Sequence, residues 1–428
     1  MNLISGAVVT REQSLDALDI LQEAICRTLS AVELPLQRLI AACDELSKRL
    51  DENTHLSALT ALGMTHEKAL AEFTQAKVML SREYIEARLA REFGEIPGAV
   101  HEFVPYGQTG SVMQAWKPLG VLLHIAAGNV DALPLLSVIE GLLTGNINLL
   151  KLPGADDGLT VPLLQELIAI EPLIADYVYV FDFPSSDAES LKKLAQLSSA
   201  VIVWGGDAAI TAVRQTVHPD TKIIEWGHKI SFAYVSGNAS DESLHGIAFN
   251  ICDTDQLYCS ACQGIYLDTN DMEEVYRFAE RFLSILAETA ARLKRALSPS
   301  LQAQKTLELY TEELESQSAA KRVFRTPHCS VIAYPDNRLE PSYMYRNCWV
   351  KPLPHAQIIP TLLPYKNRLQ TVALVCDEAV RSQLENSLLK TGIVRITSGR
   401  DMSEAYCGLP HDGEYPLLRY MKRVSIDR

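Results

Sequence analysis

The sequence has no run of eighteen or more apolar residues, so it predicts no membrane-spanning helix. Its longest apolar stretch, Val121 to Leu152, is interrupted by glycine, asparagine, aspartate, proline and glutamate residues. The first residues, Met1–Ser5, are unlike a secretory signal peptide, because no basic stretch precedes an apolar block. We therefore expect a cytoplasmic protein.

Concentrated positive charge is also missing. The 428 residues include 39 Lys and Arg against 53 Asp and Glu, a formal net charge of −14, and the basic residues are dispersed. Since a nucleic-acid partner requires clustered cations to neutralise its phosphates, we expect no nucleic-acid binding. A small basic pocket for a phosphorylated cofactor is still compatible with this charge.

The nine cysteines do not form a complete set of metal ligands at suitable spacing, so we expect no metal site. Their odd number and wide dispersion favour a reducing compartment over a disulfide framework. Hydrophobic residues make up 47% and charged residues 21%, which is typical of a soluble globular protein. The length suffices for two or three domains with a large core.

The chain shows two patterns of predicted secondary structure. Residues 13 to about 95 show apolar residues at helical spacing, such as Leu15, Leu18 and Leu21, and no evident chemistry. From about residue 112, short β-branched runs alternate with helical stretches. The first series predicts strands at 120–125, 148–152, 177–181 and 200–204, separated by helices at 133–145, 159–171 and 187–197. Such alternation predicts a parallel sheet covered on both faces.

A second alternating series runs from 231 to about 392. It contains a long helical block, 272–314, that we expect to be interrupted near Pro299 because proline cannot continue a helix.

A candidate nucleophile lies in the segment Asp255–Gln263. It places Cys259 among small and polar neighbours just before an apolar run, whereas cysteines that fill space usually lie within apolar segments. Cys259 and Cys262 are also spaced like a metal pair or a redox dithiol, but no second pair or nearby His follows, and a strand-like run rather than a helix comes next. Cys262 is better explained as structural. We predict a cysteine enzyme acting on an acyl group or an aldehyde.

Several polar residues follow predicted strands, where ligands of open α/β sheets bind. Asn129 offers an amide for an oxyanion, although a turn Asn after a glycine would look the same. Lys151 ends a strand and can meet a ribose hydroxyl or a phosphate; a solvated lysine is the alternative. The turn Trp204-Gly205-Gly206 leads into a helix whose first N–H groups can hold a pyrophosphate, but it lacks the full glycine pattern, and a plain tight turn explains it equally.

Two titratable residues complete the candidate set. Glu225 ends a strand-like run and would serve as a general base if burial raised its pKa, while a salt-bridged Glu is the alternative. His411 lies in a polar turn near the C-terminus and would assist acid–base chemistry, although a histidine in a loop is more often merely exposed.

Taken in order, these segments resemble the aldehyde dehydrogenase superfamily, and more closely its LuxC-type fatty acyl-CoA reductase branch. Asn129 corresponds to the oxyanion-hole Asn, Lys151 to a cofactor-ribose contact, and Cys259 to the nucleophile. The turn Trp204-Gly205-Gly206 corresponds to the glycine turn against the cofactor phosphates, and Glu225 to the Glu of the Glu-Leu-Gly-Gly-Lys segment. The likeness to the branch itself rests on the segments 255–260, 369–372 and 410–413.

The chain departs from ordinary aldehyde dehydrogenases at two places. The Gly-Gln-x-Cys motif has become Asp255–Cys259, with one extra residue before the thiol. The Glu-x-Phe-Gly-Pro motif that holds the nicotinamide ribose has no clear counterpart, and the corresponding region reads Arg346–Lys351.

The resemblance implies two doubly wound three-layer α/β domains with a helical N-terminal segment. The expected boundaries are a helical segment at 1–100, a dinucleotide-binding Rossmann-like domain at 101–229, a catalytic domain with the Cys nucleophile at 230–395, and a C-terminal segment at 396–428. A homo-oligomer is expected as well.

The implied function is NADPH-dependent reduction of an acyl thioester, acyl-CoA or an acyl-carrier thioester, to the aldehyde through an acyl-S-cysteine intermediate; NADH is the alternative cofactor. Asn129 and the backbone N–H of Cys259 would stabilise the oxyanion. Two alternative functions stay open: oxidation of an aldehyde to the acid, in which Glu225 would activate water, and service as an acyl-accepting subunit beside an acyl-activating partner protein.

Overall fold

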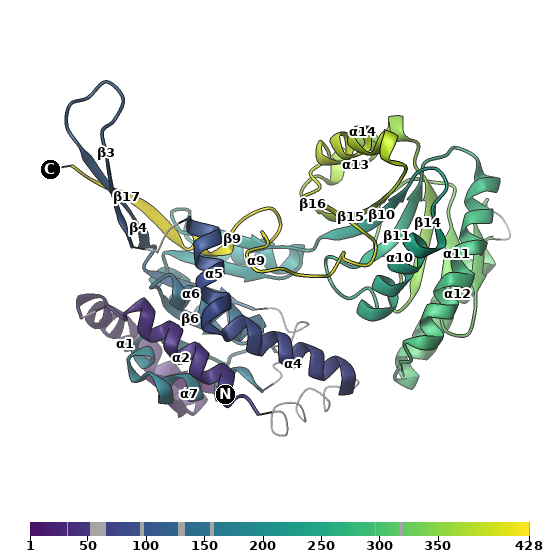
Figure 1. Ribbon diagram of the computed structural model, residues 1–428. Coiled ribbons are helices and arrows are strands. Elements are labelled where there is room, and N and C mark those ends of the chain that lie inside the picture. The colour runs from purple at the N-terminus through teal and green to yellow at the C-terminus, as the bar shows by residue number, and fades with distance from the viewer. Residues whose placement is uncertain are drawn as a thin grey trace. The chain divides into compact units, whose positions relative to one another are not determined.

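The computed structural model describes residues 1–31, 33–51, 66–94, 98–126, 133–154, 158–295, 297–316 and 320–427. The chain forms two compact units (Figure 1). Unit 1 comprises Met1–Gly227 together with Tyr406–Arg428, and unit 2 comprises His228–Ala405. Unit 2 is therefore inserted into the chain of unit 1.

The N-terminal part of unit 1 is mainly helical, as predicted. Its helices are α1 (Arg11–Ser30), α2 (Leu36–Arg49), α4 (His66–Leu80) and α5 (Arg82–Phe93). Helix α1 begins with a capping box, in which the Thr10 hydroxyl accepts from the Gln13 N–H and the Gln13 side chain accepts from the Thr10 N–H. Two short strands that the sequence did not indicate, β1 (Asn2–Ile4) and β2 (Ala7–Val9), precede α1.

The first alternating series forms a seven-stranded sheet in the order β2-β1-β7-β6-β5-β8-β9. Its parallel strands are β5 (Val121–Ile125), β6 (Ile147–Lys151), β7 (Val178–Phe181), β8 (Ala200–Trp204) and β9 (Lys222–Trp226). Strand β1 joins the edge antiparallel to β7. The four strands predicted between residues 120 and 204 are confirmed to within one residue at each end.

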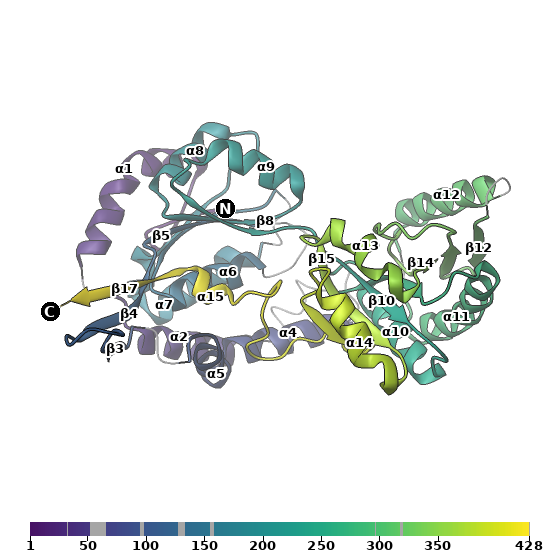
Figure 2. The same cartoon turned by 90° about the horizontal axis from the view of Figure 1, so that it is seen from above.

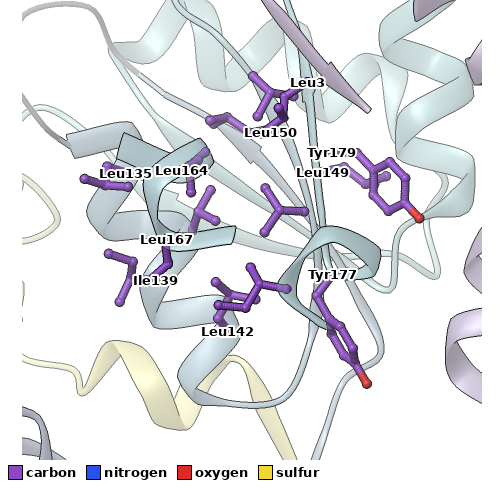
Figure 3. Close-up of a cluster of buried hydrophobic side chains, with 14 of the residues drawn as sticks. Leu3, Leu135, Ile139, Leu142, Leu149, Leu150, Leu164, Leu167, Tyr177 and Tyr179 are labelled. Atoms are coloured by element: carbon purple, nitrogen blue, oxygen red, sulfur yellow. The ribbon is translucent and has the colours of Figure 1, made fainter. Parts of the chain in front are cut away.

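Helices cover both faces of this sheet (Figure 2). On one face lie α8 (Ala188–Leu197) and α9 (Asp207–Thr216), and on the other lie α6 (Leu133–Leu143) and α7 (Thr160–Ile170). The close-up in Figure 3 shows leucines of α6 and α7, such as Leu142 and Leu167, on one side of the strands, whereas Leu149 lies with Tyr179 on the other side. Burial of both sheet faces explains the nearly continuous apolar sequence of these strands.

A separate three-stranded antiparallel sheet also belongs to unit 1. Its order is β17-β4-β3, with β3 (Val100–Phe103), β4 (Val112–Pro118) and β17 (Met421–Asp427). Before β17, the short helix α15 (Pro416–Arg419) leads to Tyr420, which is fully buried. The segment that follows unit 2 thus returns to complete unit 1.

Unit 2 contains the second sheet, in the order β12-β13-β14-β11-β10-β15-β16. Its strands are β10 (Ile230–Val235), β11 (Cys262–Leu267), β12 (Arg322–Arg325), β13 (Ser330–Ala333), β14 (Asn347–Pro352), β15 (Leu369–Val375) and β16 (Arg395–Thr397). Every neighbouring pair is parallel except β12 with β13.

The helices of unit 2 lie on both faces of its sheet. Alternate residues of β10 point to opposite cores: Val235 packs with α10 (Asp241–Thr254) and α11 (Met272–Arg292), and Phe232 packs with α13 (Ile358–Leu362) and α14 (Glu378–Leu389). The predicted helical block ends at Arg292 and resumes as α12 (Pro299–Ser316), which confirms the interruption at Pro299. Among the described residues, no helix is both long and apolar enough to cross a bilayer.

Close packing in unit 2 depends on a glycine. An ideal Cβ added to Gly264 of β11 would lie 2.1 Å from a ring carbon of the buried Trp349 on β14. We expect Gly264→Ala to destabilise the protein by about 2–3 kcal/mol, because the ring has to move within a close-packed core. Denaturant unfolding checks this. Gly154→Ala is the control, since a Cβ there meets nothing within 4 Å; equal stability of the two variants would contradict the prediction.

Candidate active site

The predicted cofactor-side residues lie at one edge of the unit 1 sheet. Counted along the chain from β5, the five parallel strands have the order 3-2-1-4-5, typical of a doubly wound sheet, which binds ligands at the carboxyl ends of its strands. Pairing places Lys151, Ile125, Val203 and Glu225 in one row across β6, β5, β8 and β9. Three strand spacings separate Lys151 from Glu225, about 14 Å between their Cα atoms. The fold thus gathers these positions at the sheet edge where doubly wound folds bind their ligands.

Lys151 is buried with 5% of its surface exposed. Its ammonium donates a hydrogen bond to the Ser185 hydroxyl at 3.1 Å. Burial lowers the pKa of Lys151, and the nearby charge of Asp182 opposes that change. A partly desolvated ammonium at this edge is a suitable partner for a ribose hydroxyl or a phosphate, whereas a merely solvated surface lysine would be exposed.

The turn after β8 has fewer backbone N–H donors available to a phosphate than its two glycines suggest. Gly206 is the N-cap of α9 and, having no side chain, leaves the first turn uncapped. The Gly205 N–H, however, donates to the Trp226 carbonyl at 3.2 Å and is engaged in the backbone structure. Asp207 in the first turn also brings a negative charge to the helix N-terminus. An anion at this helix would therefore use the N–H groups beyond Gly205.

Glu225 is bound to an arginine of α9. The Arg214 Nε and Nη2 donate to Glu225 Oε1 and Oε2, so both carboxylate oxygens accept from one guanidinium. The salt-bridged alternative raised by the sequence thus describes Glu225 in this structure.

His411 lies beside the turn after β8. Its ring centroid is 5.2 Å from that of Trp204 and 4.7 Å from that of Trp226, and the two indoles are stacked at 5.5 Å. The Arg419 guanidinium lies over the Trp226 ring at 5.0 Å. The structure therefore brings His411 and Trp204 together within unit 1, although they are 207 positions apart in the sequence.

Behind Trp204 lies a buried polar chain that sequence reasoning missed. The Trp204 indole N–H donates to the Ser137 hydroxyl at 3.4 Å, and that hydroxyl is 2.7 Å from His124 Nδ1. His124 Nε2 is 3.0 Å from Asn148 Oδ1, whose own amide NH₂ donates elsewhere. Since that oxygen only accepts, His124 carries its proton on Nε2 and accepts from Ser137. A histidine inside an apolar strand was the available signal.

Unit 2 carries the predicted nucleophile. Cys259 is exposed, in the loop between α10 and β11, where the Ala261 N–H closes a turn on the Tyr258 carbonyl at 3.0 Å. The Cys259 carbonyl accepts from the Ser231 hydroxyl at 2.7 Å, and that hydroxyl accepts from the Thr371 N–H at 3.0 Å. The backbone at the thiol is thus fixed to β10 and β15. Ser231 was not singled out from the sequence, because hydroxyl residues in strands are common, and Thr371 entered only as part of the segment 369–372.

Cys262 differs from Cys259 in every relevant respect. It is completely buried, and burial raises its pKa to about 12, so it is a neutral thiol at pH 7. All nine cysteines lie in the described part of the chain as thiols. Within that part, no group of three or more His, Cys, Asp or Glu residues is arranged to hold a metal ion. Asn129 lies outside the described residues, and its assignment stays a prediction.

Comparison with known proteins identifies the same family that the sequence motifs resemble. A family model described as acyl-CoA reductase (LuxC) matches residues 31–423. A long-chain acyl-protein thioester reductase of Aliivibrio fischeri is 24% identical over 339 residues, which cover 77% of this chain and 69% of that protein. A long-chain acyl-protein thioester reductase of Vibrio harveyi is 24% identical over 379 residues, which cover 87% of this chain and 77% of that protein.

Solved structures confirm the predicted fold. The putative aldehyde dehydrogenase PutA from Anabaena variabilis matches with a TM-score of 0.72 and 13% identity, covering 98% of this chain and 93% of that one. Lactaldehyde dehydrogenase from Escherichia coli matches with a TM-score of 0.68 and 15% identity, covering 100% of this chain and 95% of that one. The chain therefore has an aldehyde dehydrogenase-like α/β fold.

The buried His124 makes unit 1 sensitive to acid. Burial lowers its pKa from 6.5 to about 4, so between these values the unfolded chain binds a proton that the folded one does not. The stabilisation is complete above pH 6.5 and is lost as the pH falls towards 4, by up to about 3 kcal/mol. His124→Gln should remove this part of the pH dependence in denaturant unfolding, whereas His218→Gln, at an exposed position, should keep it. An unchanged slope in His124→Gln would contradict the assignment.

Proposed function

Because the chain belongs to the acyl-CoA reductase (LuxC) family, we propose that it reduces an acyl thioester to the aldehyde through an acyl group carried on Cys259. The chain is an oxidoreductase of the acyl or aldehyde group, in keeping with the named activity of its relatives. The proposed acyl donor is CoA or a protein-borne thiol; the names of the relatives favour the protein-borne thioester.

One observation carries this proposal: Cys259 is exposed on a loop whose backbone is hydrogen-bonded in place. A nucleophilic thiol must be reachable by its substrate and must be able to ionise. The buried cysteines fail both requirements, since burial raises the pKa of Cys43, Cys252 and Cys262 alike to about 12.

In the proposed reaction the Cys259 thiolate attacks the thioester carbonyl. A carbon–sulfur bond forms to Cys259, the bond to the carrier sulfur breaks, and the carrier leaves as a thiol after taking a proton. The amide of Asn129 is the proposed donor to the carbonyl oxygen while negative charge develops there. After reduction of the acyl group, the hemithioacetal on Cys259 releases the aldehyde and restores the thiol.

A nicotinamide cofactor fits the carboxyl edge of the unit 1 sheet. Lys151 supplies a desolvated ammonium for a ribose hydroxyl or phosphate, and the uncapped first turn of α9 supplies backbone N–H groups. When bound, the cofactor supplies the hydride. We propose NADPH, with NADH as the alternative. Lys151, Trp204 and Gly206 are the proposed contacts, and Gly205 would line the turn without donating its N–H, which is engaged by Trp226. His411 is proposed to line the same edge, because it packs on Trp204.

The cysteine assignment predicts a clear loss. Cys259→Ala should form no acyl-enzyme with a labelled acyl thioester, and thioester reduction should fall by roughly 1000-fold or more, because the intermediate cannot form. Intact-protein mass spectrometry and nicotinamide oxidation provide the two measurements. Cys262→Ala is the matched control and should retain labelling. A stable acyl-enzyme in Cys259→Ala would exclude Cys259 as the nucleophile.

Aldehyde oxidation is the alternative function. The role of Glu225 distinguishes it from thioester reduction. Oxidation to the acid requires a base to activate water against the acyl-enzyme, whereas reduction has no use for that water. The ion pair with Arg214 occupies both Glu225 oxygens and therefore supports the reductase.

We expect Glu225→Gln to leave thioester reduction and the hydrolytic decay of the acyl-enzyme within about threefold of the wild type, since removal of a working general base usually costs 100-fold or more. Acyl-enzyme lifetime without the reduced cofactor is the measurement for decay. Arg214→Ala is the companion variant, because it releases the same carboxylate. A decay slowed by roughly 100-fold in Glu225→Gln would instead assign Glu225 as the base and favour aldehyde oxidation.

The other expectations stay predictions. They are the homo-oligomeric state, the acyl-activating partner protein, the cytoplasmic location and the domain boundaries with their assigned roles.

A further inference from the structure

Two turns of unit 2 adopt a backbone conformation that L-residues rarely take. Met344, Tyr345 and Arg346 have φ values of +58°, +50° and +71°, in a connection that leads directly into β14. Asp255 and Gln256, at the start of the loop that carries Cys259, have φ values of +47° and +63°. Left-handed backbone without glycine is disfavoured by the side-chain Cβ, and it persists where surrounding contacts hold it.

The two turns hold each other. The Tyr345 N–H donates to the Asp255 carbonyl at 2.9 Å, and the Arg346 N–H donates to Gln256 Oε1 at 3.1 Å. The Gln256 amide in turn donates to the Cys262 carbonyl at 3.0 Å. The residues on both sides of Cys259 are thereby tied to one turn that lies 90 positions further along the chain.

The side chain of Arg346 is the centre of this contact. Its Nε donates to Asp255 Oδ1 at 3.1 Å, and its two terminal nitrogens donate to the carbonyls of Ala290 and Cys252 at 3.2 and 3.3 Å. Arg346 is 7% exposed and Asp255 2%. Arg295 supplies a second cation to the other oxygen of Asp255. A buried charge stays charged only when it is paired and hydrogen-bonded, and both charges of this pair are.

We propose that Arg346 and Asp255 are positioning residues, which fix the loop so that the Cys259 thiol is presented to an acyl thioester. This inference rests on the proposed role of Cys259 as the acyl-carrying nucleophile. Neither residue touches the reacting atoms. Their effect is to hold the segment that precedes Cys259, while the Ser231 hydroxyl holds the carbonyl of Cys259 itself. A thiol held at both sides enters the reaction without first ordering its own backbone.

The test compares Arg346→Met with Lys351→Met. Methionine keeps an unbranched apolar stem and removes the charge and the donors of the side chain. Lys351 is a matched control, because it is also a buried cation and is bound to Asp336 and Glu340. It lies at the other end of β14, about 16 Å along the strand from Arg346. Arg346→Lys keeps the charge opposite Asp255 and should recover part of what Arg346→Met loses.

Two measurements are made on each full-length variant. Hydrogen–deuterium exchange of residues 255–262 reports whether the loop is held, and it requires no activity. The rates of Cys259 acylation by an acyl thioester and of Cys259 alkylation by iodoacetamide are followed by mass spectrometry. Acylation needs an oriented thiol, whereas the small alkylating reagent needs only an accessible one, so their ratio reports positioning.

In Arg346→Met we expect exchange of the loop to rise roughly tenfold or more, because local opening no longer breaks a buried ion pair. The ratio of acylation to alkylation should fall by roughly 100-fold, the usual cost of a misplaced reacting group. Lys351→Met should leave both unchanged. Unchanged exchange in Arg346→Met would overturn the proposal, and so would increased exchange with an unchanged ratio, since the contact would then be only structural.

Two further outcomes are distinguishable. If the wild type takes no acyl group while exchange rises in Arg346→Met alone, the proposed function fails and the restraint of the loop stands. If Arg346→Met does not fold, Tyr345→Gly and Tyr345→Val replace it. Both lose the Tyr345 ring, but glycine accepts a left-handed backbone and a β-branched residue does not. The proposal then requires faster loop exchange and a lower ratio in Tyr345→Val, and equal values in the two variants would overturn it.

Discussion

A parallel sheet with helices on both faces buries nearly all of its strand residues, so polar chemistry is confined to the strand ends. Unit 1 obeys this constraint closely: Lys151 and Glu225 occupy the same row at the carboxyl ends of their strands, and the turn at Trp204 adjoins that row. In unit 2 the thiol instead precedes β11 and lies at the amino end of its strand. The candidate site residues of the two units therefore lie at opposite strand ends of their respective sheets.

Two of the polar side chains that enter the interior show how a buried polar group can be paired. His124 is satisfied by Ser137 and Asn148, and burial keeps it neutral at physiological pH. Lys351 is enclosed by two carboxylates and a carbonyl. Because an unpaired polar group in these positions would cost several kcal/mol, each such group specifies its partners and thereby the register of the elements that carry them.

Much of the fold was accessible from sequence because strand and helix periods are local properties. The β-branched runs of unit 1 predicted β5 to β8, and Pro299 predicted the break between α11 and α12. The order of the motifs predicted the family and the aldehyde dehydrogenase-like fold. The short strands β1, β2, β3 and β17 were not predicted, since runs of three to seven residues carry too little pattern to distinguish them from loops.

The site was only partly predictable for a different reason. Polarity and small neighbours marked Cys259, and its exposure agrees with that interpretation. Partners distant in sequence leave no local signal: nothing near Glu225 indicated that Arg214 binds both of its oxygens, and nothing near Asp255 indicated Arg346. The engagement of the Gly205 N–H likewise depends on Trp226 of the neighbouring strand.

The return of residues 406–427 to unit 1 has a consequence for biosynthesis. Tyr420 fills the space between the sheet and α6, and its carbonyl accepts from the Leu119 N–H and the Asn146 amide, nearly 300 positions upstream. During translation, all of unit 2 leaves the ribosome before these contacts can form. Unit 2 can therefore fold as a unit while the core of unit 1 still lacks Tyr420, which joins it only after residues 406–427 have been made.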